Sequence, residues 1–421
     1  MYFLIALIFI SKISLQFIPG IPFEIPNIIF QYGFHPYVNI ILCFMFGSTL
    51  ITKRLLKLQT ELAVQLKFYS FYIFIFCVYL FIITGLQMIF FDSGESPVLQ
   101  AAACAMSMFM IYLFGRYIPT QLSPRGFILM VQRYAAFLCW VCLLFLFISS
   151  RTSFMGGRFI GVFKHIPHMV SVSTLAYVFS LYHLFCLDQT RIKRIYLYAT
   201  MICAASLLFL TGTRSALASI AVATVLSFIL FKSKTIQAKL SKVLVITFVF
   251  STGLFFGTDI TDYAVQVSRG ERSVGLRAAQ DGLSSRWDEV MRGYASFQEQ
   301  PWLGYGILNK FGRGEDGGVG SYNASKDPHN MIISSGVVGG WGFIGIISLG
   351  IIGLFILTLK RLSSKNEAIQ LLAIYMITQL PIIFIYHVHI SIGGIADRIY
   401  WLVIGYLAIS RFYITEKKTD P

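Results

Sequence analysis

The stretch that decides the fold is NMIISSGVVGGWGFIGIISLGIIGLFIL, from Asn330 to Leu357, which directly follows Asp327-Pro328-His329. It contains no charged residue and exceeds the roughly 20 mostly apolar residues that a helix needs to cross a bilayer. The longest polar segment of the chain, Asp259 to Pro328, comes immediately before it. A membrane protein that ends its longest polar loop in a His at the lipid boundary is predicted to do chemistry there.

The composition of the whole chain fits this reading. Of its 421 residues, 56% are hydrophobic and 13% are charged, against about 25% charged in soluble domains. The first apolar run, Met1 to Phe17, lacks the basic start and the small-residue cleavage site of a signal peptide, so we interpret it as a membrane span. We therefore predict an all-α polytopic membrane protein with about 12 transmembrane helices, near residues 2–17, 37–52, 68–91, 98–115, 126–149, 169–187, 195–211, 215–232, 243–258, 330–357, 368–386 and 399–413.

The distribution of Lys and Arg sets the orientation. Basic residues gather in every second loop, so the positive-inside rule places both termini in the cytoplasm. That rule also accounts for much of the formal net charge of +15 without nucleic acid as a partner. The predicted divisions are transmembrane helices 1 to 9 over 1–258, a large outer loop over 259–328, and helices 10 to 12 with a cytoplasmic tail over 329–421. The seven Cys fall in apolar spans and are predicted to be packing residues, with no metal site.

Basic residues on the opposite side need a separate explanation. Arg158 lies in a short outer loop, Arg214 in a tight turn, and Arg398 close to the last span. An Arg near the membrane interior is costly, and by default it indicates a functional site. The alternative is an interfacial side chain that reaches the headgroups. We predict that these residues meet a bound anion, helped at Arg214 by the Gly212 turn and the free amides at the start of the next helix.

The large loop contains one predicted helix. Trp287, Val290, Met291, Tyr294 and Phe297 form a single apolar stripe at helical spacing. Pro301 and Gly304 are predicted to end the helix, which would lie on the membrane surface or cap the bundle.

Arg286 opens this helix, where the helix dipole disfavours a cation, so an anionic partner is expected. Together with Arg214, it would clamp a diphosphate through the fork geometry of guanidinium groups.

His329 stands at the N-terminus of a predicted span. The helix dipole there keeps an imidazole neutral and able to accept a proton, as general-base catalysis requires. Asn330 would orient the acceptor or the His, and His168, in an earlier outer loop, would line the site. The alternative for a lone His at a membrane boundary is a polar anchor.

The set of motifs resembles the bacterial O-antigen ligase and O-antigen polymerase superfamily. The resemblance covers mainly residues 158–345 and rests on the order and spacing of short pieces: Arg-Phe-Ile-Gly at 158–161, Thr-Gly-Thr-Arg-Ser-Ala-Leu at 211–217, Ser-Arg-Trp at 285–287, Gln-Pro-Trp-Leu-Gly-Tyr-Gly at 300–306, and Pro-His-Asn at 328–330 before a Gly-rich span.

The resemblance implies an inverting, metal-independent glycosyltransferase with a GT-C-like fold and no cofactor, in the inner membrane of a bacterium. The donor would be a glycan on undecaprenyl diphosphate at the periplasmic face. Arg214 and Arg286 would hold the diphosphate, and His329 would activate the acceptor hydroxyl. Arg158, His168, Asn330 and Arg398 would complete substrate binding.

The acceptor stays open at this point. A ligase would use lipid A–core, whereas a polymerase would use a second lipid-linked repeat unit. The spacing of 72 residues from Arg214 to Arg286 and 43 from Arg286 to His329 resembles that of ligases. A polysaccharide flippase or other transporter is the rival from another class, but it predicts two similar halves; a scaffold without chemistry leaves the outer Arg and His residues unexplained.

Overall fold

The computed structural model describes residues 5, 9, 67–90, 105, 108, 111–148, 154–155, 158–163, 166–232, 238–246, 283–305, 330–383 and 395–409. The predicted spans at 2–17, 37–52, 98–115 and 243–258 therefore lie largely outside the described residues. Within these ranges the fold is helical. Its elements are α4 (Lys67–Phe90), the π-helix η3 (Leu113–Tyr117), α6 (Ile118–Gln121), α7 (Pro124–Ile148), α8 (Ile166–Cys186), α9 (Arg191–Leu210), α10 (Arg214–Leu230), α14 (Leu283–Glu299), α15 (Met331–Leu362), α16 (Glu367–Ile383) and α17 (Ile395–Ala408).

The predicted class of helical membrane protein is confirmed. Within the described residues, four helices are long and apolar enough to cross a membrane, namely α7, α8, α9 and α15. Shorter apolar segments lie within α4 and α10. The all-helical prediction missed one feature, a two-stranded antiparallel ribbon of β1 (Phe154–Met155) and β2 (Arg158–Phe159).

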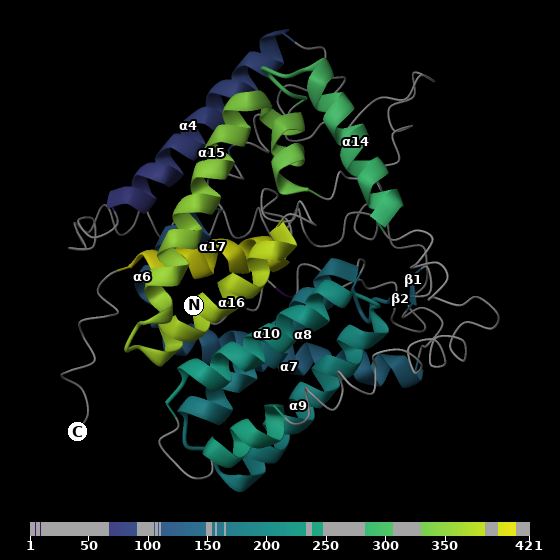
Figure 1. The fold of residues 1–421 in the computed structure, drawn as a ribbon, viewed down its shortest axis with the longest axis vertical. Helices are drawn as coiled ribbons and strands as arrows, with labels where there is room; N and C mark the ends of the chain where they lie inside the picture. The colour runs from purple at the N-terminus through teal and green to yellow at the C-terminus, as the bar shows by residue number, and fades with distance from the viewer. Residues whose placement is uncertain are drawn as a thin grey trace.

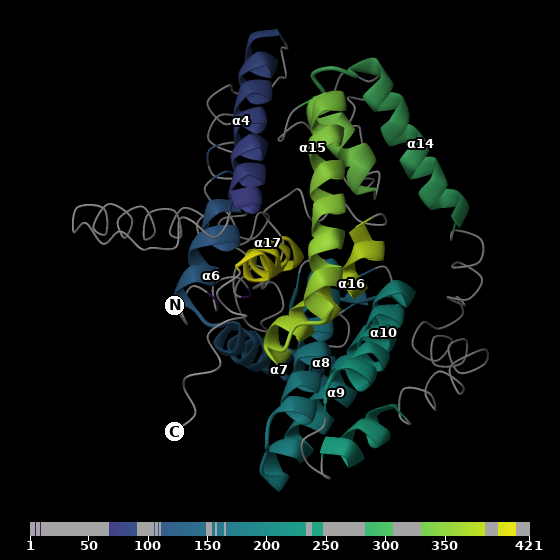
Figure 2. The ribbon, with the colours of Figure 1, turned by 60° about the vertical axis from the view of Figure 1, so that its left-hand side comes forward.

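Two groups of helices make up the described fold. One contains α7, α8, α9 and α10, and the other contains α4, α14 and α15, with α16 and α17 between them (Figures 1 and 2). In the first group, Trp140 Nε1 of α7 donates to Thr200 Oγ1 of α9 at 3.2 Å. Ser219 Oγ of α10 donates to the Thr378 carbonyl of α16 at 3.0 Å and so joins the first group to α16.

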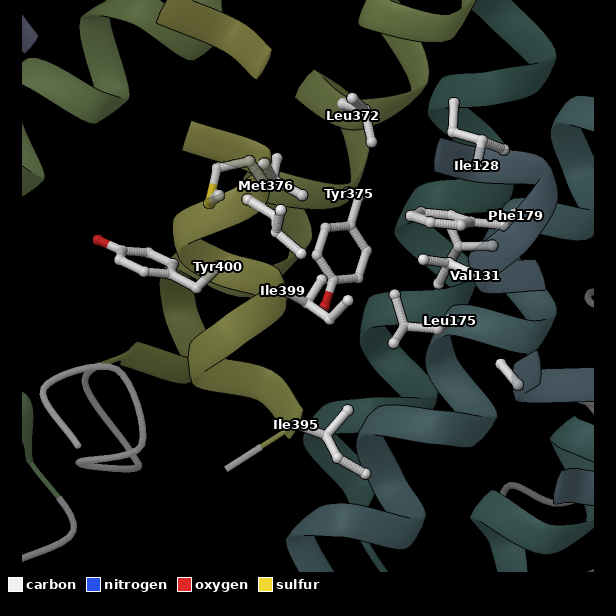
Figure 3. Close-up of a cluster of buried hydrophobic side chains, with 14 of the residues drawn as sticks. Ile128, Val131, Leu175, Phe179, Leu372, Tyr375, Met376, Ile395, Ile399 and Tyr400 are labelled. Carbon is white, nitrogen blue, oxygen red and sulfur yellow. The ribbon is translucent and has the colours of Figure 1, made fainter. Parts of the chain in front are cut away.

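The apolar core joins the first group to α16 and α17. Figure 3 shows side chains from α7, α8, α16 and α17 meeting there, and Tyr375 of α16 points toward Phe179 of α8. The two ring centroids are 5.7 Å apart with the planes at 69°, an edge-on contact. Such aromatic pairs add about 0.5–1.5 kcal/mol beyond the area that they bury. Helix α17, which carries Arg398, packs against α8 as part of this core.

Helix α15 is broken in the middle. Gly339 and Gly340 depart from helical geometry, and Gly340 has a φ of 69°. A helix that breaks in an apolar environment frees backbone groups, and each of them needs a new partner. The break therefore requires polar groups from other segments to meet it.

These partners come from two places. The turn after α14 supplies its backbone: Tyr305 N–H donates to the Val337 carbonyl at 2.6 Å, and Trp341 N–H donates to the Pro301 carbonyl at 2.8 Å. Helix α4 supplies side chains: Gln87 Nε2 donates to the Val338 carbonyl at 2.8 Å, and Tyr79 hydroxyl donates to the Gly339 carbonyl at 2.7 Å. Gln87 Nε2 also donates to the Leu303 carbonyl at 2.5 Å.

Two glycines let the backbones approach each other. A side chain at Gly304, whose φ is 64°, would meet the Gly339 nitrogen at 2.6 Å. A side chain at Gly340 would collide with the carbonyl oxygen of Trp302. The turn and the break are therefore built to fit each other.

Replacing Gly340 with Ala tests this fit. With a φ of 69° and a ψ of −166°, this backbone conformation is open essentially to glycine alone and costs about 1–3 kcal/mol for a residue with a Cβ. The contact with Trp302 adds to that cost, so Gly340→Ala should lower the unfolding temperature of the detergent-solubilised protein. Gly345→Ala is the matched control, because it lies in the same helix and its Cβ would have no neighbour within 4 Å. Equal unfolding temperatures for the two variants would contradict the proposed fit.

Candidate functional site

Arg158 is fixed by the turn between α9 and α10. From β2 its Nε donates to the Thr211 carbonyl at 2.7 Å, and its Nη2 donates to Thr213 Oγ1 at 2.9 Å. Thr211 and Thr213 are buried, and Thr211 Oγ1 donates to Thr213 Oγ1 at 3.0 Å. Gly212 makes the predicted turn, and its φ of 64° puts it in the left-handed region. A guanidinium and two hydroxyls thus hold the turn in one conformation.

Arg214 is the first residue of α10, directly after this turn. Thr213 is the N-cap residue but makes no side-chain cap hydrogen bond, because its hydroxyl faces Arg158. The first amides of α10 thus keep the anion affinity of an uncapped helix start. The backbone of Arg214 is placed beside the guanidinium of Arg158; its side chain lies outside the described atoms.

His168 belongs to the same end of this group. It lies in the first turn of α8 and is half-buried. Its ring centroid is 6.5 Å from that of Phe163, which follows the ribbon. Three predicted site residues, Arg158, His168 and Arg214, are therefore carried by β2 and by the two helices that begin next to it.

Arg286 lies in the first turn of α14, and its side chain is outside the described atoms. The helix ends at Glu299, as Pro301 and Gly304 predicted. It meets the broken part of α15 through the turn that follows it, and its N-terminal end points toward the part of the molecule that holds α10 (Figures 1 and 2).

The predicted apolar stripe of α14 is only partly buried against the rest of the protein. Phe297 is buried and packs on Trp341 with ring centroids 4.9 Å apart, but Met291 and Tyr294 are 45% and 39% exposed. The buried face runs instead through the small residues Gly293 and Ser296. Small side chains let α14 approach α15 closely, an effect that apolar spacing alone does not reveal.

Asn330 caps α15. Its Oδ1 accepts from the amides of Ile332 and Ile333 at 3.0 and 3.1 Å, so that oxygen has a structural role. The residue before it, His329, lies outside the described residues. The cap fixes where α15 begins.

Tyr305 ties the turn after α14 to that helix. Its hydroxyl donates to Glu299 Oε2 at 2.6 Å. Burial raises the pKa of Tyr305, and the hydrogen bond and charge of Glu299 raise it further. The phenol therefore stays protonated and remains a donor at neutral pH.

Arg398 differs from the other predicted site residues because it is fully buried. Its exposed fraction is 0%, and its guanidinium carbon lies 5.9 Å from the centre of the Phe114 ring in η3. Contact with a lipid-linked substrate would require the neighbours of Arg398 to move. Its substrate-binding role stays a prediction.

The structure thus gathers the predicted residues into two units. One holds Arg158, His168 and Arg214 on β2, α8 and α10; the other holds Arg286 and Asn330 on α14 and α15. Within the described part of the chain, no group of three His, Cys, Asp or Glu side chains could hold a metal ion. Cys139 and Cys142, a Cys-x-x-Cys spacing in α7, are buried free thiols.

Sequence reasoning missed several polar residues that hold these units. Gln87 is an amide inside an otherwise apolar run, and that isolation was a usable signal. Tyr79 is one of 22 Tyr residues, so nothing in the sequence distinguishes it. Thr211 and Thr213 belong to one of the sequence motifs. The motif does not reveal their hydrogen-bond partner, because Arg158 is more than fifty residues away in the chain.

These features define a helical membrane protein with an Arg-bearing turn, in which α14 and the turn after it dock on a broken helix. Residues 199–358 match a family model described as O-antigen ligase. The match spans Arg214, α14 and most of α15, and it confirms the resemblance to the O-antigen ligase and polymerase superfamily. It supports a ligase-like, glycosyl-transferring function. No curated protein matches the chain.

Replacing Arg158 with Lys should loosen the turn before Arg214. A Lys ammonium cannot reproduce the planar fork that reaches Thr211 and Thr213 together, and an unmet buried hydrogen bond costs about 1–3 kcal/mol. The unfolding temperature in detergent should fall. Arg292→Lys on the exposed part of α14 is the control and should be nearly neutral. An equal effect of the two changes would show that the fork is not needed.

Proposed function

We propose that this protein is a glycosyltransferase that moves a glycan from undecaprenyl diphosphate to an acceptor hydroxyl at the periplasmic face of the inner membrane. The favoured acceptor is lipid A–core, which makes the reaction O-antigen ligation. The observation that carries the proposal is the double hydrogen bond of Arg158 to the Thr211–Thr213 turn. It joins two separate motif residues, Arg158 and Arg214, beside a helix N-terminus suited to a phosphate.

The chemistry follows from the residue types. His329 takes the proton of the acceptor hydroxyl, and the resulting oxygen attacks the anomeric carbon of the donor sugar. The bond from that carbon to the diphosphate oxygen breaks on the opposite face, so the configuration inverts. Arg214 and Arg286 stabilise the charge that develops on the leaving undecaprenyl diphosphate. Guanidinium groups would supply the positive charge in this mechanism without a metal ion.

The full architecture that we propose has twelve spans in a GT-C-like arrangement, with both termini in the cytoplasm. Two hydrogen bonds support this order of spans. Each joins two segments that the distribution of Lys and Arg places on the same side of the membrane. Gln87, at the outer end of α4, bonds the loop at Leu303. Arg361 Nε, at the inner end of α15, donates to the Leu407 carbonyl near the inner end of α17 at 3.0 Å.

The alternative within the same chemistry is an O-antigen polymerase, in which a second lipid-linked repeat unit replaces lipid A–core. The donor site would be the same. A polysaccharide flippase, which is a transporter and catalyses no glycan transfer, is the alternative from another class of protein. Deletion of the chain in its host and gel analysis of lipopolysaccharide separate the three. Core without O-antigen, together with long lipid-linked chains, indicates the ligase; core with one repeat unit indicates the polymerase; and repeat units retained on the cytoplasmic side indicate the flippase.

His329→Ala, expressed in the deletion strain, tests the general base. We expect transfer to fall by about two to four orders of magnitude, the usual contribution of such a base, while membrane insertion stays normal. Transfer is read from the lipopolysaccharide gel and from purified enzyme with lipid-linked donor. His389→Ala, a residue without a role in this mechanism, is the control and should restore ligation. Normal glycan transfer by the His329 variant would show that His329 is not the general base.

Arg214→Lys and Arg286→Lys test the diphosphate clamp. A point charge cannot replace the bidentate fork, so each variant should lose about tenfold or more in transfer rate. Arg292→Lys, on the same helix as Arg286, should transfer at the wild-type rate. Wild-type rates in both clamp variants would exclude the clamp, and loss of activity with chelator, restored by a divalent ion, would exclude the metal-independent mechanism.

A further inference from the structure

A second cluster of cations lies at the opposite end of α7, α8 and α9 from the candidate site. Gln132 Nε2 of α7 donates to Ser180 Oγ of α8 at 3.2 Å, which places the start of α7 beside the end of α8. Helix α9 begins after a short connection from that end. The N-termini of α7 and α9 and the C-terminus of α8 therefore lie at the same end of these three helices.

This end is rich in exposed positive charge. Arg125 and Arg133 on α7 and Arg191 and Lys193 on α9 are all exposed. The three helices contain no Asp or Glu, and Asp188 is the single carboxylate in the connection between α8 and α9. Cations in the first turn of α9 also oppose its dipole. An external anion would relieve both sources of repulsion.

A buried imidazole points to the same conclusion. His183 of α8 is 9% exposed, and the charges of Arg133, Arg125 and Lys193 all act on its ring. Its Nε2 is buried and has no hydrogen-bond partner among the described residues. Buried polar atoms nearly always have a partner. The three cations concentrate positive charge around this buried ring, so an anion bound at the neighbouring surface would offset it.

The surroundings favour a lipid over a free ion. Exposed apolar side chains alternate with the cations: Ile192 is 80% exposed and Ile195 59% exposed on α9, and Phe137 on α7 is 63% exposed. Both helices continue as candidate membrane spans. Cations beside an apolar surface match the headgroup and acyl chains of one molecule.

We infer that the N-terminal ends of α7 and α9 and the C-terminal end of α8 form a binding site for an anionic phospholipid. Arg133, Arg125 and Lys193 hold its phosphate, and Ile192, Ile195 and Phe137 contact its acyl chains. The site lies at the far end of α9, which has 20 residues, from the turn bound by Arg158, or roughly 30 Å away. It is therefore separate from the proposed glycosyltransferase site.

The test uses the purified full-length protein in detergent. Phosphatidylglycerol and phosphatidylcholine are titrated separately, and bound lipid is counted by native mass spectrometry. The double variant Arg133→Gln/Lys193→Gln removes two exposed charges from the site. The matched control Lys360→Gln/Lys365→Gln removes two exposed charges at the end of α15, on the same predicted side of the membrane.

The wild-type protein should bind phosphatidylglycerol more tightly than phosphatidylcholine. The double variant should bind it roughly fivefold more weakly for each charge removed, and the control should bind like the wild type. Wild-type affinity in the double variant, an equal loss in the control, or equal affinity for the two lipids would overturn the proposal. Displacement by inorganic phosphate at the same concentration as the lipid would also overturn it, because the ligand would then be a free anion.

Discussion

The structure depends on one constraint, which is that a helix broken in an apolar environment must have its backbone groups satisfied by something else. Gly339 and Gly340 break α15. The carbonyls and the amide that the break exposes are met by the backbone of Pro301 and Tyr305 and by side chains from α4. Because each unmet buried group would cost about 1–3 kcal/mol, the loop that follows α14 cannot leave the break without a large penalty.

This constraint organises the candidate site. The docked turn makes α14 and α15 one unit, so the backbones near Arg286 and Asn330 keep a fixed relation to each other. The other unit is held in a different way, by the guanidinium of Arg158 inserted at the turn before Arg214. Charge that is positioned before a substrate arrives costs no reorganisation during reaction. Both units bring together segments that are remote in sequence, as the proposed diphosphate site would require.

Cations lie at both ends of the three helices α7, α8 and α9, but they have different roles. At the end that holds the candidate site, Arg158 donates two hydrogen bonds to the protein itself, at Thr211 and Thr213. At the other end, Arg133 and Lys193 are exposed, and their charges act on the buried ring of His183. The first arrangement positions a turn, whereas the second offers its charge to a ligand. Sequence charge counts alone make the two ends look alike.

The sequence by itself determined the features that depend on near neighbours. Long apolar runs define the spans that the structure describes as α7, α8, α9 and α15, and local rules placed the Gly212 turn and the end of α14 before Pro301. These outcomes follow from hydrophobic length and backbone geometry, which a few consecutive residues set. The tertiary structure decided which face of α14 is buried, what fills the break in α15, and which partner Arg158 binds. Those depend on contacts between residues far apart in the chain, such as Gln87 with Leu303, and no local pattern encodes them.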